Sequence, residues 1–196
     1  MPWQNVFAYP VIDYQNNIFE AVNKNDYKPI ISKSSLTDAD EGYANYILGY
    51  QNTKLLKAYN RYCMDNDYTD YIVWPVYYLA DFEKDNPAPF YTTGWFVPSP
   101  KELSLLCGGD EDNVINGAYT LVTSRAINVV LNELLSENVS IDLLDTKGDN
   151  YFWSSTEYKD IGDWDCAIGI NFNNNGMRGN LSKTINEFGV RAVCAF

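Results

Sequence analysis

The side chains of this chain that could do chemistry are carboxylates and thiols, because the sequence contains no histidine. Without an imidazole, catalysis by a Ser–His or Cys–His pair is excluded, and the commonest ligand of transition metals is missing. The four cysteines are widely spaced and include no CxxC pair, which gives no support to a zinc site: Cys63, Cys107, Cys166 and Cys194. Their spacing leaves open whether all are buried thiols or two of them form a disulfide.

The carboxylates are abundant but show no catalytic pattern. No spacing singles out a pair for hydrolysis, and no cysteine has the basic neighbour that would activate it as a nucleophile. Two acidic runs, 64–70 and 108–113, could offer oxygen ligands to calcium, but the first lacks the glycine that an EF-hand loop has at its sixth position. We therefore expect no enzyme, no metal site and no cofactor, with calcium kept as an alternative.

Composition and charge restrict the partners of the chain. Its 196 residues, 46% of them apolar and 15% aromatic, are typical of a globular domain. A net charge of −12 repels phosphate backbones and anionic membranes, so we expect no nucleic acid partner. The longest apolar run, 71–82, is too short to span a bilayer and contains Pro75, which predicts no membrane insertion.

The first three quarters of the chain read mainly as helices. Apolar residues at helical spacing predict a helix over 52–63, and Ser99, Pro100 and Glu102 mark the start of a second helix. A longer helix is expected within 113–136, and a short one is possible at 16–24. The run 71–82 is rich in β-branched and aromatic residues and predicts a strand interrupted at Pro75. The buried face of the longer helix is expected to consist of Ile127, Val130, Leu131 and Leu134.

The last fifty residues change to short β-type segments at 150–158, 164–172 and 189–196. The asparagine-rich stretch 173–187 is expected to be a loop, with a tight turn at Asn175–Gly176. The fold class predicted from this order is α+β, with helices packed on a small, mostly antiparallel sheet that carries long C-terminal loops.

Four motifs occur in an order that is similar to a known group. They are "GWFVPSPKEL" at 94–103, "YFWSSTEY" at 151–158, Trp164-x-Cys166 with "NFNNNG" at 171–176, and "VRAVCAF" at 190–196. This set resembles the bacterial C-type-lectin-fold domains. Within that group it is most similar to the variable proteins of diversity-generating retroelements and to related surface domains. The resemblance covers roughly residues 49–196.

The resemblance implies a C-type-lectin-like domain at 46–196, after an N-terminal extension or edge element of unknown role at 1–45. It also implies a diversified surface, because these retroelements copy a template of the gene with errors at its adenines. Those adenines often lie in asparagine codons. Between the fixed-looking Arg178, Lys183 and Val190, all intervening residues except Glu187 are reachable from such codons. Outside that stretch, Met177 and Lys159 are not reachable. The expected framework residues are Trp95, Trp153, Val190, Val193 and Phe196. The expected ligand-binding surface residues are Asp160, Ile161, Asp163, Asp165, Met177, Asn180, Leu181, Ser182, Ile185, Asn186 and Phe188.

The function predicted from these observations is non-enzymatic binding of an unknown protein or glycan through a diversified C-terminal surface. Two alternatives stay open: a surface adhesin of the same fold with a fixed ligand, and a structural or assembly module of a fibre. The triplets that hold calcium and sugar in many C-type lectins are absent, so calcium-dependent sugar binding finds little support. The expected location is extracellular, at the cell surface or on a virion, although residues 1–10 lack the pattern of a signal peptide.

Overall fold

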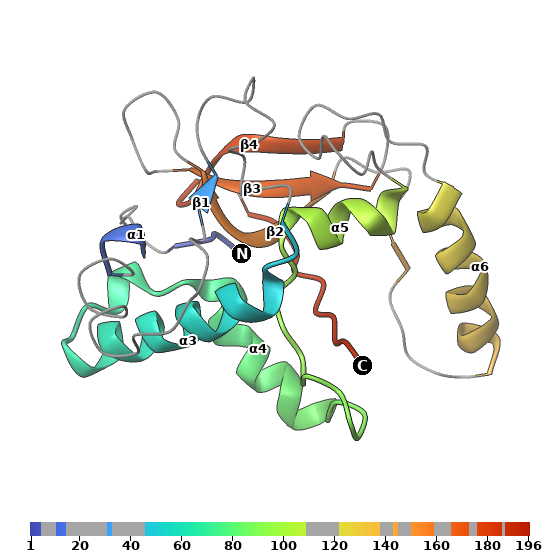
Figure 1. Ribbon diagram of the computed structural model, residues 1–196, viewed down its shortest axis with the longest axis horizontal. Coiled ribbons are helices and arrows are strands. Elements are labelled where there is room, and N and C mark those ends of the chain that lie inside the picture. Colours follow the sequence, from blue (N-terminus) through green and yellow to red (C-terminus); the bar gives the residue numbers. More distant parts are fainter. Residues whose placement is uncertain are drawn as a thin grey trace.

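The computed structural model describes residues 1–4, 11–14, 31–32, 46–108, 122–137, 143–144, 150–158, 166–172, 176–185 and 187–196. Figure 1 shows a sheet at the top of the view, α3 and α4 beneath it, and α5 and α6 toward the right. The elements in chain order are α1 Val11–Tyr14, β1 Ile31–Ser32, α3 Gly49–Asp65, η3 Thr69–Tyr71, α4 Trp74–Asp85, α5 Pro100–Cys107, α6 Val122–Ser136, β2 Tyr151–Tyr158, β3 Cys166–Asn171 and β4 Gly176–Ser182.

The sheet has four strands in the order β1-β2-β3-β4. The β2–β3 and β3–β4 pairs are antiparallel, and the short β1 pairs in parallel with the end of β2. Register shifts occur between Trp153 and Glu157 on β2 and between Ala167 and Gly169 on β3. The predicted α+β class, with a small and mostly antiparallel sheet, is confirmed.

Both faces of the central strands are covered. Every described residue of β3 is buried, and β2 is buried except for partly accessible Phe152. Neighbouring residues of β3 belong to different core clusters: Ala167 packs with α3 and α4, whereas Ile168 and Ile170 pack with α5. Successive side chains of a strand point to opposite faces, so one strand contributes to two cores.

The predicted helices at 52–63 and after Ser99 are confirmed as α3 and α5. In α5, the Ser99 hydroxyl accepts a hydrogen bond from the Glu102 N–H, while a Glu102 carboxylate oxygen accepts one from the Ser99 N–H. This reciprocal capping box satisfies N–H groups that the first turn of a helix leaves unpaired. Gly108 ends the helix in the left-handed conformation that glycine adopts readily.

The strand predicted at 71–82 is wrong, because this segment forms most of α4. Pro75 lies in the first turn, where its missing N–H removes no helical hydrogen bond and its fixed φ favours the helix. Pro75, Val76 and Leu79 are buried, which is the spacing of one helix face. Of the aromatic residues that suggested a strand, Tyr77, Tyr78 and Phe82 are exposed, whereas Tyr71 and Trp74 pack against the core.

Two expectations at the C-terminal end are also wrong. Residues 176–182, expected in a loop, form β4, and its Met177 and Leu181 are buried on β3. Residues 189–196, expected as a buried strand, make isolated bridges at Gly189 and Val193 and no strand of their own. Phe196, expected in the framework, is 98% exposed. Of the other framework residues, Trp153 is fully buried and Trp95 and Val190 pack against the core.

The described residues near the N-terminus join the same core. Trp3 is fully buried, Val11 packs with it, and β1 pairs with β2 at the sheet edge. The division at residue 45 stays a prediction. α6 lies where the longest helix was expected, but Val130, expected on its buried face, is exposed, whereas Ile127, Leu131 and Leu134 are half-buried. The possible helix at 16–24 lies outside the described residues.

Candidate binding surfaces

The residues predicted to form a variable surface are divided by the structure. Met177 and Leu181 are buried in the core clusters, so the expectation that they are exposed is wrong. Ser182 is half-buried, and Phe188 packs its ring on Tyr151 and Trp153. Ile185 is 80% exposed and remains available for contact. Asn180 lies on β4, and the remaining candidates lie outside the described residues: Asp160, Ile161, Asp163, Asp165 and Asn186.

A charged junction lies inside the molecule, close to these predicted residues. The fully buried Lys183 ammonium donates a hydrogen bond to the equally buried Glu157 carboxylate, which also accepts one from the Val11 N–H. The same ammonium lies 5.0 Å from the centre of the Trp3 ring. We call Trp3, Val11, Glu157 and Lys183 the enclosed junction. It joins the N-terminal segment to β2 and to the residues after β4.

Backbone hydrogen bonds extend this junction to both ends of the chain. The N–H groups of Trp3 and Gln4 donate to the Lys183 carbonyl, and Met1 and Phe188 exchange hydrogen bonds in both directions. The Trp153 indole N–H donates to the Met1 carbonyl. This region is therefore structural, since its polar groups are used to hold the chain together.

The opposite situation is found on α4, whose outward face carries aromatic side chains. Trp74 stacks on Tyr78 with ring centres 5.3 Å apart, and Tyr77 meets Trp74 edge-on at 5.1 Å. Phe82 continues the row and meets Trp95 edge-on at 5.4 Å. We call Trp74, Tyr77, Tyr78, Phe82 and Trp95 the aromatic stripe. Such rings present apolar faces and hydroxyl groups together, which is the composition of many binding surfaces.

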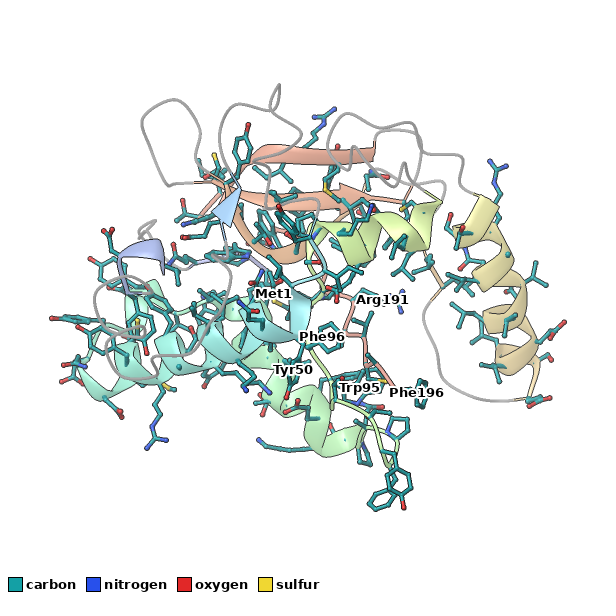
Figure 2. All side chains as sticks on the ribbon, viewed as in Figure 1. Met1, Tyr50, Trp95, Phe96, Arg191 and Phe196 are labelled. Carbon is teal, nitrogen blue, oxygen red and sulfur yellow. The ribbon has the colours of Figure 1, made fainter. Side chains whose placement is uncertain are left out.

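A second exposed aromatic group follows α4 in the sequence. Phe90 and Tyr91 are 82% and 86% exposed, and Tyr91 has a φ of 68°, a conformation that costs energy for a bulky residue. The loop is tied to the C-terminal segment, since the Thr93 N–H donates to the Ala195 carbonyl over 2.9 Å. Figure 2 shows the labelled Trp95 and Phe196 in this same part of the molecule.

A groove lies between α3 and α4 and has a volume of about 370 Å³. Tyr77 of the aromatic stripe forms part of its wall, so the aromatic and polar features meet there. We call this cavity the α3–α4 groove, and its lining residues are Lys57, Asn60, Met64, Val76, Tyr77, Ala80, Asp81 and Lys84.

The rim of the groove carries both hydrogen-bond donors and acceptors. Lys57 forms an ion pair with Glu83 at 3.1 Å, and Lys84 forms one with Asp81 at 2.6 Å. The side-chain hydrogen bond to Asp81 raises the pKa of Lys84, which favours its charged form. Asn60 lines the groove, but its amide is already used: its Nδ2 donates to the Val73 carbonyl, and its Oδ1 accepts from the Val73 N–H.

Burial makes at least two of the thiols poor nucleophiles. All four cysteines are free, which settles the question that their spacing left open. Burial raises the pKa of the Cys107 thiol to about 12 and also raises that of Cys63. A thiol with so high a pKa is protonated at neutral pH and reacts poorly as a nucleophile.

Among the described residues, no group of three or more Cys, Asp or Glu side chains is arranged to hold a metal ion. Within the same part of the chain, no helix is long and apolar enough to cross a membrane. The acidic run 64–70 lies at the end of α3 and in η3, and the run 108–113 lies beyond the described residues except for Gly108.

The aromatic stripe was missed in the sequence because its segment was assigned to a strand. Read with a helical period, Trp74, Tyr78 and Phe82 repeat every four residues and Tyr77 joins them at a spacing of three, which is one helix face. Pro75 at the first turn was the available signal for the helix. A similar signal existed for β4, where Met177 and Leu181 alternate with polar Arg178 and Ser182.

The comparisons with known proteins found two similar proteins, both described as fimbrial. No protein-family profile matches the sequence. The chain is 32% identical, over 130 residues, to a Bacteroides ovatus protein named as a fimbrium tip subunit, Fim1C; the alignment covers 65% of this chain and 20% of that protein. A crystal structure of a fimbrial protein from Bacteroides ovatus matches all of this chain and 33% of its own, with a TM-score of 0.67 and 23% identity. The chain thus spans about a fifth of the length of the first relative and about a third of the second. It shares with the second a fold that occurs as one part of a larger fimbrial protein.

Proposed function

We propose that this chain is a non-enzymatic, adhesin-type module of a cell-surface fimbrium. The observation that carries the proposal is the similarity to a fimbrium tip subunit, together with a shared fold over the whole chain. A tip position places a module where it meets external ligands. The exposed rings of Tyr77, Tyr78 and Phe82 support this function, because contiguous exposed apolar surface is typical of interaction sites.

An immunolabelling experiment tests the location. Antibodies raised against the purified chain should label fibres, and especially fibre ends, in electron micrographs of cells that express the gene. The matched control is the same strain with the gene deleted, which should lose the label. Labelling confined to the cell interior would contradict the proposal.

A structural or assembly role within the fibre is the second candidate. It is favoured by Phe90, Tyr91 and Phe196, whose exposed rings offer an apolar contact to a neighbouring subunit. In this case deletion of the gene would shorten or remove the fibres. In the adhesin-type case, fibres would remain while adherence to the target surface would fall.

The C-type-lectin-like fold and the diversified surface are finer parts of the same proposal. The order of the four motifs along the sequence supports the first. For the second, Ile185 offers an exposed contact, but Met177 and Leu181 are buried and no longer count among the candidate surface residues. Sequencing the 3′ end of the gene across its source population tests diversification: a near-copy downstream, with substitutions confined to its adenines, supports it, whereas an invariant gene without a copy rejects it.

A further inference from the structure

We propose that the α3–α4 groove is a glycan-binding site in which a sugar ring stacks on Tyr77. This inference rests on the proposed adhesin-type function and names the class of ligand. It depends on the meeting of two features at one place: the aromatic stripe on the outward face of α4, and a rim of charged donors and acceptors between α4 and α3.

Only part of the aromatic stripe serves the core. α4 buries Pro75, Val76 and Leu79, and Trp74 and Trp95 pack partly against the same core. Tyr77, Tyr78 and Phe82 are exposed, although a helix that is apolar on both faces is normally enclosed. These three rings are therefore the part of the stripe that is open to a ligand.

The exposed rings of this face suit a sugar. Tyr77, Tyr78 and Phe82 present their rings on the exposed side of α4. A pyranose has an apolar face of C–H groups that stacks on an aromatic ring, and a rim of hydroxyl groups that needs both donors and acceptors. The rings are held in place by contacts with one another, so little side-chain freedom is lost on binding.

The groove supplies the polar half of this complementarity. Lys57 and Lys84 are donors, and Asp81 is an acceptor next to Tyr77 on the same wall. Both ion pairs are at least one-third exposed and hence weak, so a ligand hydroxyl can replace one partner at low cost. The volume of about 370 Å³ lies within the range of small-molecule sites.

The stripe also offers room for more than one sugar unit. Trp74 and Phe82 are eight residues apart, which on a helix corresponds to roughly 12 Å. Trp95 lengthens the row beyond Phe82. We therefore expect an oligosaccharide to bind more tightly than its monosaccharide.

The first experiment is a glycan array probed with the full chain, with neutral, N-acetylated and sialylated oligosaccharides on the array. Titration calorimetry with the best-bound free oligosaccharide then compares the wild type with three variants. We expect Tyr77→Ala to weaken binding about tenfold, and Tyr77→Phe, which keeps the ring, to stay within about threefold. The matched control is Tyr50→Ala, since Tyr50 is 45% exposed on α3 and does not line the groove.

The outcomes separate this inference from the proposed function. Absence of binding to every glycan on the array, or equal binding by the wild type and Tyr77→Ala, overturns the glycan site. Sedimentation measurements in which the wild type self-associates and Tyr77→Ala does not, without glycan binding, assign the face to a protein contact and overturn it too. If the antibodies still label the fibres in any of these cases, the proposed function is retained and only the glycan is rejected as ligand.

Discussion

The enclosed junction and the aromatic stripe use similar residues in opposite ways. In the junction, the Trp3 indole N–H donates to the Ser154 carbonyl, and its ring covers the ammonium of Lys183. On the stripe, the Trp74 N–H has no partner among the described residues, and its half-buried ring meets the exposed rings of Tyr77 and Tyr78. The comparison teaches that aromatic residues alone do not mark a site. What distinguishes the two regions is whether the surrounding chain satisfies their polar groups and covers their faces.

The largest effect is expected from breaking the enclosed junction. Lys183→Ala would leave the Glu157 carboxylate buried without its ammonium partner, which we expect to lower the free energy of unfolding by about 3–5 kcal/mol. Urea denaturation measures this loss. The control, Lys57→Ala, removes an exposed ion pair and should cost less than about 1 kcal/mol.

A second variant of the junction distinguishes charge from packing. Combining Lys183→Met with Glu157→Gln removes both charges but keeps an acceptor for the Val11 N–H. This double variant should be more stable than Lys183→Met alone, which keeps a similar volume but leaves the Glu157 carboxylate buried without its ammonium partner. Equal stability of these two variants would mean that the charge of the pair is of little consequence.

A pair of tyrosines sharpens the comparison directly. Tyr59 on α3 is buried, meets Tyr14 edge-on and accepts a hydrogen bond from Gln4, so Tyr59→Ala should cost about 3–5 kcal/mol of stability. Tyr77 on the stripe is exposed, and Tyr77→Ala should cost less than about 1 kcal/mol. Thermal unfolding of both variants measures the difference. Similar losses would show that the stripe is part of the core.

Close packing predicts an intermediate effect at the start of α3. A methyl group added at Gly49 would lie 2.8 Å from the Ser99 nitrogen and 2.9 Å from the Phe96 ring, besides meeting the Glu102 carboxylate. Gly49→Ala should therefore lower stability by about 1–3 kcal/mol, despite the helix preference of alanine. Lys54→Ala, on the exposed side of the same helix, is the control and should change stability little. If Gly49→Ala left the free energy of unfolding unchanged, α3 and α5 would be able to move apart without loss of stability.

The smallest effect concerns the thiols and leaves the fold intact. At pH 8, iodoacetamide should modify the half-buried Cys194 in the native chain before it reaches Cys107. Burial raises the pKa of Cys107 to about 12, so its reactive thiolate is scarce at this pH. Mass spectrometry of the alkylated peptides gives the order. In urea all four thiols should react, and fast native modification of Cys107 would contradict its enclosure.

Some elements could be predicted because their signals are local. The helix start at Ser99, Pro100 and Glu102 depends on hydrogen bonds between residues three positions apart, so a short stretch of sequence contains the complete capping signal. The apolar period of Leu55, Leu56 and Tyr59 likewise identifies one buried face of α3. The segment 151–158 is rich in aromatic residues and forms β2 over those same positions.

The secondary structure of other segments could not be predicted from their local sequence. The segment 71–82 contains residues that suit both a strand and a helix, and its helix is stabilised by contacts of Val76 and Leu79 with distant parts of the core. The segment 176–182 is polar at most positions, and its strand exists because β3 offers an edge to pair with. The terminal segment has the composition of a strand, but among the described residues it finds only isolated bridges to Phe96 and Phe152.

The sequence by itself determined the α+β class, the start of α5, the absence of histidine chemistry and the abundance of aromatic residues, because these depend on composition and on neighbours along the chain. Only the tertiary structure decided which aromatic residues are enclosed and which are exposed. It also decided that Lys183 is buried beside Glu157 and that Tyr77 borders a groove with Lys57 of another helix. These outcomes depend on contacts between residues far apart in the chain, where burial and pairing are set by the packing of whole elements.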